Sequence, residues 1–265
     1  MRLENRIATI TGAGSGMGRA MAIAFAKEGA TVVVSDINLQ GAEEVAHEIV
    51  HSGRNAIPLK VDVSQEGDAE KLISTAVAKY GKLDIHVNNA GISQTKLFVH
   101  TTKEEFEKIL GVNLVGAFLC ARYAAVEMLK HRYGRIINIA SLSGQRGGIG
   151  RVAYGSSKAG LELMTKVMSV ELASSGINVN NIAPGAIATK MAAAQHDAAT
   201  KDAYHYLIPQ RRYGRPEEIA DAAVFLASDA ASHICGTTLN VDGGFLGAGL
   251  MFEHSALSVP KVPVV

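Results

Sequence analysis

The chain has 265 residues, 48% of them hydrophobic, which is enough to bury the core of one α/β domain. A formal net charge of +1 and the absence of a basic block argue against partners such as nucleic acid or a membrane surface, so we expect a small-molecule partner. The two cysteines form no metal-binding or disulfide pattern, and the first residues lack a signal-peptide pattern. We therefore expect a cytoplasmic protein with no metal site and no membrane-spanning helix.

Short runs rich in β-branched residues alternate with segments of helical periodicity along the chain. The expected strands are residues 6–10, 31–35, 57–61, 84–87, 135–140, 177–182 and 237–241. The expected helices are residues 19–28, 39–51, 70–79, 103–129, 154–174 and 216–228. Apolar strands separated by helices are typical of a parallel sheet covered on both faces. We expect a single-domain, doubly wound, Rossmann-like α/β fold over residues 1–265.

Two segments lie outside this alternation. Residues 186–213 hold few large apolar side chains before Tyr204, and we expect an irregular, mobile lid over a substrate there. Residues 245–265 form an apolar C-terminal tail with few charges, which we expect to pack against a neighbouring subunit.

A glycine-rich turn follows the first expected strand and reads TGAGSGMG from Thr11 to Gly18. Glycine permits tight turning and close approach of the backbone to a pyrophosphate, which a helix N-terminus then attracts. The pattern is not GxGxxG, because Met17 or Arg19 stands where that motif has Gly or Ala. A turn that binds no cofactor could also use these glycines. The residues predicted to bind a dinucleotide here are Gly12, Ser15, Gly16, Met17 and Gly18.

Asp36 ends the second expected strand, 18 residues beyond Gly18 and near the offset of about 20 for an acid that binds the adenosine ribose. Its carboxylate can accept hydrogen bonds from both ribose hydroxyls and would repel a 2′-phosphate, so we expect NAD rather than NADP. Arg19 and Lys60 are the cations that a 2′-phosphate would use instead. Two later strand ends are expected to flank the adenine and its ribose, and they supply Asp62, Val63, Asn89, Ala90 and Gly91.

Tyr154 and Lys158 are four residues apart on an expected helix and so share one face. A nearby ammonium lowers the tyrosine pKa from about 10 toward the range of a general acid/base. Such spacings also arise by chance on amphipathic helices. Ser141, at the carboxyl end of an expected strand, strengthens the interpretation because its hydroxyl could donate to the substrate oxygen that Tyr154 protonates.

In combination these motifs resemble the short-chain dehydrogenase/reductase family, in order, from about residue 3 to residue 245. The motifs are TGAGSGMG, Asp36, Asn88-Asn89-Ala90-Gly91, Asn113, Ser141, Tyr154-xxx-Lys158 and Pro184-Gly185. The resemblance implies hydride transfer between a nicotinamide and a carbinol carbon, with Tyr154 moving the hydroxyl proton. It also implies a homotetramer with subunit contacts through residues 103–129 and 154–174.

The resemblance also assigns roles that spacing cannot show. Asn113 would hold a water that links Lys158 to solvent, and Lys158 would bind the nicotinamide ribose. The residues implied to contact the nicotinamide are Pro184, Gly185, Ile187 and Thr189. His86 departs from the family, which usually has an aliphatic residue there, and we interpret it as a packed or rim histidine.

Several polar residues are candidates for substrate binding. Ser143 competes with Ser141 for the donor role, and we prefer Ser141 because it directly ends the strand. Arg146 and Arg151 could anchor an anionic substrate group, although solvated arginines are the more common case. Gln145, Arg211 and Arg212 are weaker candidates of the same kind, and His47 and His51 have a metal-ligand spacing without a third ligand.

The leading expectation is an NAD-dependent dehydrogenase of a secondary alcohol or ketone, such as a sugar, polyol or cyclic diol. Alternatives are an NADPH-dependent 3-oxoacyl thioester reductase and a non-enzymatic, cofactor-sensing binding protein. An isomerase or lyase of the longer sugar-nucleotide branch is disfavoured, because little chain follows Gly244 to form a substrate domain.

Overall fold

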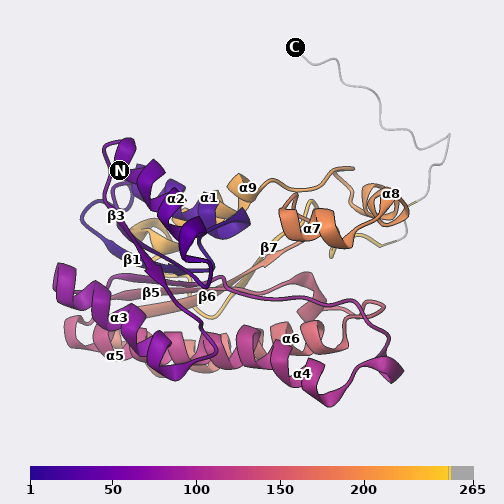
Figure 1. Ribbon diagram of the computed structural model, residues 1–265, viewed down its shortest axis with the longest axis horizontal. Coiled ribbons are helices and arrows are strands. Elements are labelled where there is room, and N and C mark those ends of the chain that lie inside the picture. The colour runs from indigo at the N-terminus through magenta and orange to yellow at the C-terminus, as the bar shows by residue number, and fades with distance from the viewer. Residues whose placement is uncertain (250, 252–265) are drawn as a thin grey trace, which may run out of the picture.

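The computed structural model describes residues 1–249 and 251. Within these residues seven strands form one sheet in the order β3-β2-β1-β4-β5-β6-β7, and every pair is parallel (Figure 1). The strands are β1 (Ile7–Thr11), β2 (Thr31–Asp36), β3 (Ala56–Lys60), β4 (Ile85–Asn88), β5 (Gly134–Ile139), β6 (Ile177–Pro184) and β7 (Thr238–Val241). The order reverses beside β1, which is the switch point where doubly wound folds bind ligands.

Helices cover both faces of the sheet (Figure 1). On one face lie α1 (Gly16–Lys27), α2 (Leu39–His51) and α9 (Pro216–Ala227), and on the other lie α3 (Glu66–Tyr80), α5 (Ala117–His131) and α6 (Val152–Leu172). Helix α4 (Lys103–Leu110) packs against α6, whereas α7 (Lys190–Gln195) and α8 (Ala198–Leu207) extend past the sheet. The expected doubly wound Rossmann-like fold is confirmed.

The two layers of helices create two apolar cores because alternate side chains of a strand point to opposite faces. In β5, Ile136 belongs to the core beneath α3 and α5, and its neighbour Ile137 belongs to the core beneath α1 and α9. All six residues of β5 are buried. This central strand reads Gly-Arg-Ile-Ile-Asn-Ile, so it is buried on both faces and apolar except for Arg135 and Asn138.

A chain of hydrogen-bonded polar side chains crosses the α5 side of the sheet. Thr9 Oγ1 lies 2.8 Å from His86 Nδ1, and His86 Nε2 lies 2.9 Å from Asn88 Oδ1. The Asn88 amide then donates to Asn138 Oδ1 at 2.8 Å, and Asn138 donates to Thr165 Oγ1 at 2.7 Å. The chain continues through Asn181 to Thr238. Strand register brings these side chains together, because Thr9 pairs with His86 across β1 and β4, and Asn88 pairs with Asn138 across β4 and β5.

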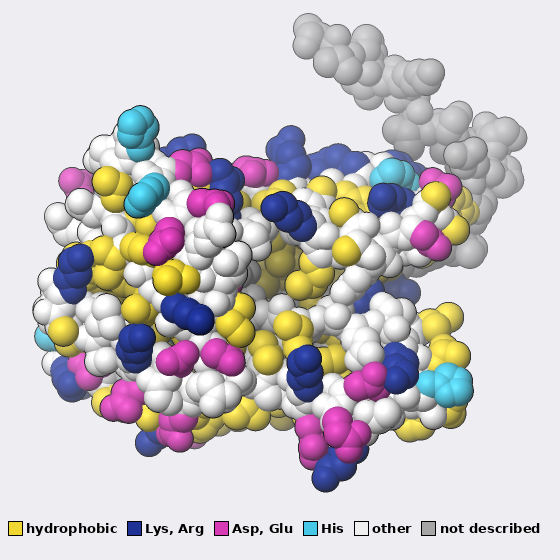
Figure 2. Space-filling view, in the orientation of Figure 1, with side chains coloured by type: hydrophobic (Ala, Val, Ile, Leu, Met, Phe, Trp, Pro, Cys, Tyr) yellow, Lys and Arg dark blue, Asp and Glu magenta, His cyan; other side chains and the backbone are white. Residues whose placement is uncertain are grey.

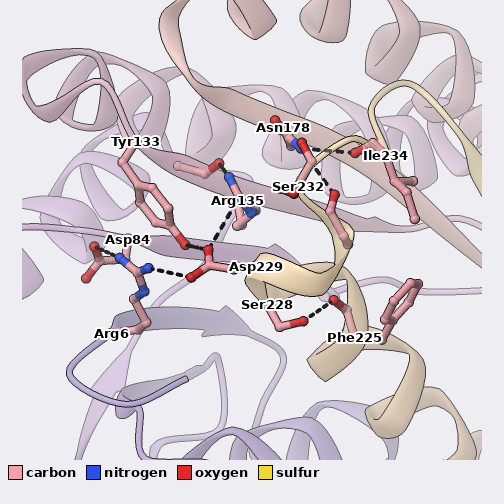
Figure 3. Close-up of polar contacts among 12 residues, drawn as sticks. Arg6, Asp84, Tyr133, Arg135, Asn178, Phe225, Ser228, Asp229, Ser232 and Ile234 are labelled. Carbon is pink, nitrogen blue, oxygen red and sulfur yellow. Dashed lines mark hydrogen bonds and ion pairs between the residues drawn. The ribbon is translucent and has the colours of Figure 1, made fainter. Parts of the chain in front are cut away.

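A second polar network lies at the amino ends of the strands, opposite the end where ligands bind in this fold (Figure 3). The guanidinium groups of Arg6 and Arg135 lie 4.0 and 4.7 Å from the centre of the Tyr133 ring. Asp229 accepts from Arg6 at 3.3 Å and from Arg135 at 3.4 Å, and buried Asp84 pairs with Arg6 at 3.6 Å. This network joins the segment after α9 to the starts of β1, β4 and β5.

Two sequence expectations need correction. The helix expected over residues 103–129 runs on to His131 and contains a π-helical stretch, Gly111–Gly116, between α4 and α5. Residues 186–213 are not irregular, because α7 and α8 lie in this segment, each capped by a side chain, Thr189 and Asp197. Capping satisfies free backbone N–H groups, so helices form there without a strong apolar pattern.

The tail lies largely outside the described residues, since residues 250 and 252–265 are not among them. Phe245 and Leu246, at its start, pack against Ala140, Leu142 and Ala183 of the same chain. By length and hydropathy, residues Lys103–His131 pass the criteria for a membrane-spanning helix, but half of the most apolar window is buried in the fold. Core helices satisfy the same criteria, so this is weak evidence for a membrane span.

Candidate active site

Three adjoining cavities open at the carboxyl ends of the strands. We name them the adenosine cavity, of about 1040 Å³, the catalytic cavity, of about 820 Å³, and the outer cavity, of about 1380 Å³. Met17, Asn89 and Thr189 line both the adenosine and catalytic cavities, and Ser141 and Tyr154 line the catalytic one. Figure 2 shows that the surface is hollowed between the α7–α8 segment and the region of α4.

The glycine-rich turn forms the wall between β1 and α1. A Cβ on Gly18 would lie 2.1 Å from the Gly12 carbonyl oxygen, and one on Gly12 would lie 2.9 Å from Ala90 Cα. Asn89 fastens the turn by donating to the Thr11 and Gly12 carbonyls at 2.9 and 3.0 Å. The backbone can therefore approach a pyrophosphate closely at the N-terminus of α1, which fits a dinucleotide. Gly18 itself lines none of the three cavities and serves this packing.

The predicted adenosine contacts come together around the carboxyl end of β2. The adenosine cavity is lined by Gly12, Ser15, Gly16, Met17, Asp36, Asp62, Val63, Asn89, Ala90, Gly91 and Thr189 among the predicted residues. Asp36 accepts from the backbone N–H groups of Gly14 and Asn38, each at 2.9 Å and on different oxygens. Each carboxylate oxygen keeps a lone pair for a ribose hydroxyl.

Arg19 and Lys60, the cations that could have bound a 2′-phosphate, lie outside the adenosine cavity. Arg19 pairs with Glu48 at 2.6 Å, and neither Arg19 nor Lys60 lines the adenosine cavity. Among the described residues that line it, Lys190, the first residue of α7, carries the single positive charge.

Tyr154, Ser141 and Lys158 line the catalytic cavity together. Burial raises the pKa of Tyr154, and the Ser141 hydroxyl and the charge of Arg151 oppose that shift. Lys158 is buried, donates to the Ile139 carbonyl at 2.7 Å and has its Nζ 5.8 Å from the centre of the Tyr154 ring. Burial lowers the pKa of Lys158 to about 8. The arrangement can exchange a proton with a substrate oxygen held between the two hydroxyls.

Asn113 lies behind the cavity wall, in the π-helical stretch. Its side chain accepts from the Ile92 N–H at 2.8 Å and donates to the Ile92 carbonyl at 2.9 Å and to Ser157 Oγ at 3.1 Å. The π geometry turns this side chain toward the β4 loop and the α6 helix. Asn113 thus joins the segment after β4 to the helix that carries Tyr154 and Lys158, and π-helical turns are frequent at functional sites.

The other predicted residues divide into two groups. Pro184, Gly185, Ile187 and Thr189 line the catalytic cavity, and Ser143, Arg146 and Arg151 line the outer one. The weaker candidates lie elsewhere: Arg212 pairs with Glu218 at 2.7 Å, Arg211 bonds the Tyr206 carbonyl, and Gln145 bonds Glu162 and Asn240. His47 and His51 are exposed, and within residues 1–249 and 251 no cluster of three metal-ligating side chains occurs.

Sequence reasoning missed several residues of the cavity walls: Ser93, Gln195, His196, Tyr204 and Phe245. The His196 ring stacks on Tyr204 with centroids 5.0 Å apart, and its Nδ1 lies 2.9 Å from the Tyr213 hydroxyl. Ser93 follows the Asn-Asn-Ala-Gly segment by two residues, which is a usable signal. Gln195, His196 and Tyr204 come from the segment expected to cover the substrate and Phe245 from the start of the C-terminal tail, and no motif distinguishes individual side chains in either segment.

Comparison with known proteins agrees with this geometry. A family model described as enoyl-(acyl carrier protein) reductase matches residues 12–246. The 3-oxoacyl-[acyl-carrier-protein] reductase FabG of Thermotoga maritima is 38% identical over 246 residues, covering 93% of this chain and 100% of that protein.

Two solved structures are similar over the whole fold. A 7α-hydroxysteroid dehydrogenase complexed with NADH and 7-oxo glycochenodeoxycholic acid has a TM-score of 0.90 at 39% identity, covering 92% of this chain and 95% of that one. A putative NAD(P)-dependent gluconate 5-dehydrogenase from Beutenbergia cavernae, with bound NADP, has a TM-score of 0.89 at 37% identity, covering 93% and 98%.

The fold and the site define an oxidoreductase that uses a nicotinamide cofactor and acts on a small molecule. The chain belongs to the short-chain dehydrogenase/reductase family, as the sequence motifs predicted.

Proposed function

We propose that the protein reduces the keto group of a 3-oxoacyl thioester to a hydroxyl. The observation that carries the chemistry is the Ser141–Tyr154 pair on the wall of the catalytic cavity, with buried Lys158 beneath it. The similarity to FabG supports the substrate class and favours this function over the sugar and polyol alternative. The outer cavity supports it too, because apolar Leu142, Leu207 and Phe245 offer a surface to an acyl chain.

The chain's own residues orient the substrate and move the proton. When bound, the reduced nicotinamide supplies a hydride to the keto carbon. Ser141 donates a hydrogen bond to the keto oxygen, and Tyr154 gives its phenolic proton to that oxygen as negative charge develops. The Lys158 ammonium stabilises the resulting phenolate. In this proposal the Asn113 segment holds the water through which Tyr154 is reprotonated by way of Lys158.

We propose NAD(H) as the cofactor, on the geometry of Asp36. Asp36 lines the adenosine cavity, and each of its carboxylate oxygens accepts one backbone N–H and keeps a lone pair for a ribose hydroxyl. A 2′-phosphate bound there would be repelled by this negative charge. The pairing of Arg19 with Glu48 supports the same preference.

A second candidate function is an NAD-linked dehydrogenase of secondary alcohols, which was our leading expectation from sequence. Asp36 favours it, and so does similarity to a hydroxysteroid dehydrogenase whose structure contains NADH. The two functions share Ser141, Tyr154 and Lys158 and differ in what fills the outer cavity.

Steady-state kinetics separate these functions. The first arm measures oxidation of NADH and of NADPH with 3-oxobutanoyl-CoA, and the second measures NAD reduction by a panel of secondary alcohols, polyols and sugars at alkaline pH. We expect the highest kcat/KM for the thioester with NADH. Turnover of an alcohol without turnover of the thioester would reverse the order of the two candidates, and a preference for NADPH would overturn the role given to Asp36.

We also propose that the protein acts in the cytoplasm as a homotetramer. Large apolar side chains are exposed on α5 and α6, the helices implied to form subunit contacts: Phe118, Val126, Leu129, Leu163, Val167 and Val170. A second copy of the chain would cover these apolar side chains, because burying them in a subunit contact removes them from water.

A further inference from the structure

The walls of the catalytic and outer cavities carry positive charge and no negative charge. Among the described residues that line them there is no Asp or Glu, whereas Arg146, Arg151 and Lys158 are cations. Lys158 is buried and bonded to a backbone carbonyl. Two arginines therefore face the space left for the substrate.

Arg151 differs from the other arginines near the site in its partners. Its Nη1 donates to Ser93 Oγ at 2.7 Å and to Gln195 Oε1 at 3.5 Å, and both acceptors are neutral. Within residues 1–249 and 251 it makes no ion pair, and its Nη2 and Nε donate no hydrogen bond to the protein. A guanidinium has five N–H donors, so three remain for a ligand in a fixed planar fork.

The other arginines near the site either form an ion pair within the protein or are more exposed than Arg151. Arg212 forms its ion pair with Glu218, and Arg146, which is exposed, stacks on the Phe245 ring at 4.6 Å. Arg151 is only partly exposed and lines the catalytic and outer cavities alike. Attraction between a partly desolvated guanidinium and a carboxylate is stronger than at an open surface.

The position of Arg151 determines which part of a substrate it reaches. Its guanidinium carbon lies 5.9 Å from the centre of the Tyr154 ring, whose hydroxyl meets the reacting oxygen. A group held by Arg151 is therefore only a few bonds from the keto carbon. In a 3-oxo acid the carboxylate carbon is two bonds from that carbon, which matches this short reach.

We propose a further activity of this site: reduction of free 3-oxo acids, and oxidation of the matching 3-hydroxy acids, with the substrate carboxylate bound by Arg151. The inference rests on the proposed keto-reductase chemistry. A C–H bond forms at the keto carbon with the hydride of the reduced nicotinamide, the C=O π bond breaks, and the oxygen takes the Tyr154 proton. A thioester carbonyl occupies the same place without charge, so the free acid gains more from Arg151.

The test compares 3-oxobutanoate with its neutral ethyl ester as substrates for NADH oxidation. Charged hydrogen bonds of this kind change affinity by about 10- to 100-fold, so we expect the wild type to prefer the acid by at least about tenfold in kcat/KM. Arg151→Met should lower the acid-to-ester ratio of kcat/KM by about 10- to 100-fold, mainly through the KM for the acid, because any effect through the Tyr154 pKa acts on both substrates alike. Equal losses for acid and ester would overturn the inference.

Two further variants guard against a general structural effect. Arg151→Lys keeps the charge and loses the fork, so it should retain part of the preference for the acid. Arg212→Met removes an arginine whose partner is Glu218 and should leave the acid-to-ester ratio unchanged. A loss of the preference in Arg212→Met as large as in Arg151→Met contradicts the assignment.

A binding measurement separates this inference from the proposed function. Calorimetry of the NAD-saturated protein with 3-oxobutanoate and with the ester needs no turnover. We expect the acid to bind at least about tenfold more tightly and Arg151→Met to remove the difference. Tight binding of the acid that depends on Arg151, without reduction of either ketone, would refute the proposed reductase function and support carboxylate binding by Arg151. Reduction of both ketones, with the acid and the ester bound equally tightly, would refute carboxylate binding by Arg151 and support the reductase function.

Discussion

At the scale of single residues, burial opposes the use of Tyr154 as a base. Burial raises the pKa of Tyr154, so the phenol is protonated at neutral pH before the cofactor binds. The positive charge of Arg151 acts in the opposite direction. The Lys158 ammonium, whose Nζ lies 5.8 Å from the centre of the Tyr154 ring, and an oxidised nicotinamide would also favour the phenolate. A protonated Tyr154 suits reduction of a ketone, whereas oxidation of an alcohol needs the phenolate.

We therefore expect opposite pH dependences for the two directions. The kcat/KM for ketone reduction should stay constant with pH and fall only near the raised Tyr154 pKa. The kcat/KM for alcohol oxidation should rise with pH from lower values, because the oxidised nicotinamide favours the phenolate. Initial rates in both directions between pH 6 and 10.5 would measure this. Tyr154→Phe should lower kcat by about 10²- to 10⁴-fold in both directions while cofactor affinity persists, and retained activity would refute the proton-transfer role.

Lys158 carries a stability cost that depends on pH. Burial lowers its pKa in the fold to about 8, from the ordinary lysine value of 10.5. Between these two values the unfolded chain holds the proton and the folded chain does not, so the Lys158 contribution to stability rises with pH there. Below about pH 8 both states hold the proton and the contribution is flat.

Replacing Lys158 should reveal its pH-dependent contribution to stability. Lys158→Met should unfold at higher denaturant concentration than the wild type at pH 7, and the gap between the two should shrink by up to about 1.4 kcal/mol per pH unit above pH 8. Urea titrations at several pH values measure this difference in unfolding free energy. The variant should also lose turnover, which an activity assay measures. A gap that widens above pH 8 would contradict the assigned direction of the shift.

At the scale of secondary-structure elements, the polar chain across the sheet ties five strands together. Asn88 donates to Asn138 Oδ1 and to the Ala117 carbonyl, so its own oxygen must accept from His86 Nε2. His86 is therefore the neutral Nε2–H form, and burial holds its pKa at about 4. The sequence interpretation of a packed histidine is confirmed, but its partners depend on strand register.

Breaking the chain at His86 should destabilise the fold. His86→Leu leaves the Thr9 hydroxyl and the Asn88 oxygen buried without this partner, and we expect unfolding free energy to fall by about 2 to 4 kcal/mol. Urea denaturation checks it, with His47→Leu on the exposed face of α2 as the control, expected within about 0.5 kcal/mol of the wild type. A His86→Leu protein as stable as the control would mean that the network contributes nothing.

The π-helical stretch is the element that sequence reasoning could not anticipate. Periodicity over residues 103–129 predicts one continuous helix, because a single extra residue in one turn barely changes the apolar pattern. The extra residue is held by contacts outside the helix, from Asn113 to Ile92 and Ser157 and from Asn88 to Ala117. Its location therefore depends on neighbouring strands and on α6.

At the scale of the whole molecule, α5 and α6 carry an apolar stripe of exposed side chains: Phe118, Val126, Leu129, Leu163, Val167 and Val170. Val170 is 82% exposed and Val167 is 49% exposed on the same helix. Exposed side chains of this kind at helical spacing suit helix-to-helix packing between copies of the chain.

A charge placed in that stripe should dissociate the proposed assembly. We expect Val170→Glu to shift the protein from a tetramer to smaller species at micromolar concentration, as measured by light scattering after gel filtration, because an unpaired carboxylate would be buried at the contact. Val50→Glu on α2, where the valine is 53% exposed, is the matched control and should leave the mass unchanged. A wild-type monomer would contradict the proposal.

The sequence by itself determined the fold class, the family and the residues at the carboxyl ends of β1, β2, β4 and β5. Those features depend on local patterns: apolar runs, glycines where backbones approach closely, and polar residues directly after strands. Only the tertiary structure decided which arginine keeps free donors beside Tyr154, how α7 and α8 cover the cavities, and where the polar chain and π turn lie. Each of those arises from contacts between residues far apart in the chain, such as Arg151 with Ser93 and Gln195, which no local pattern encodes.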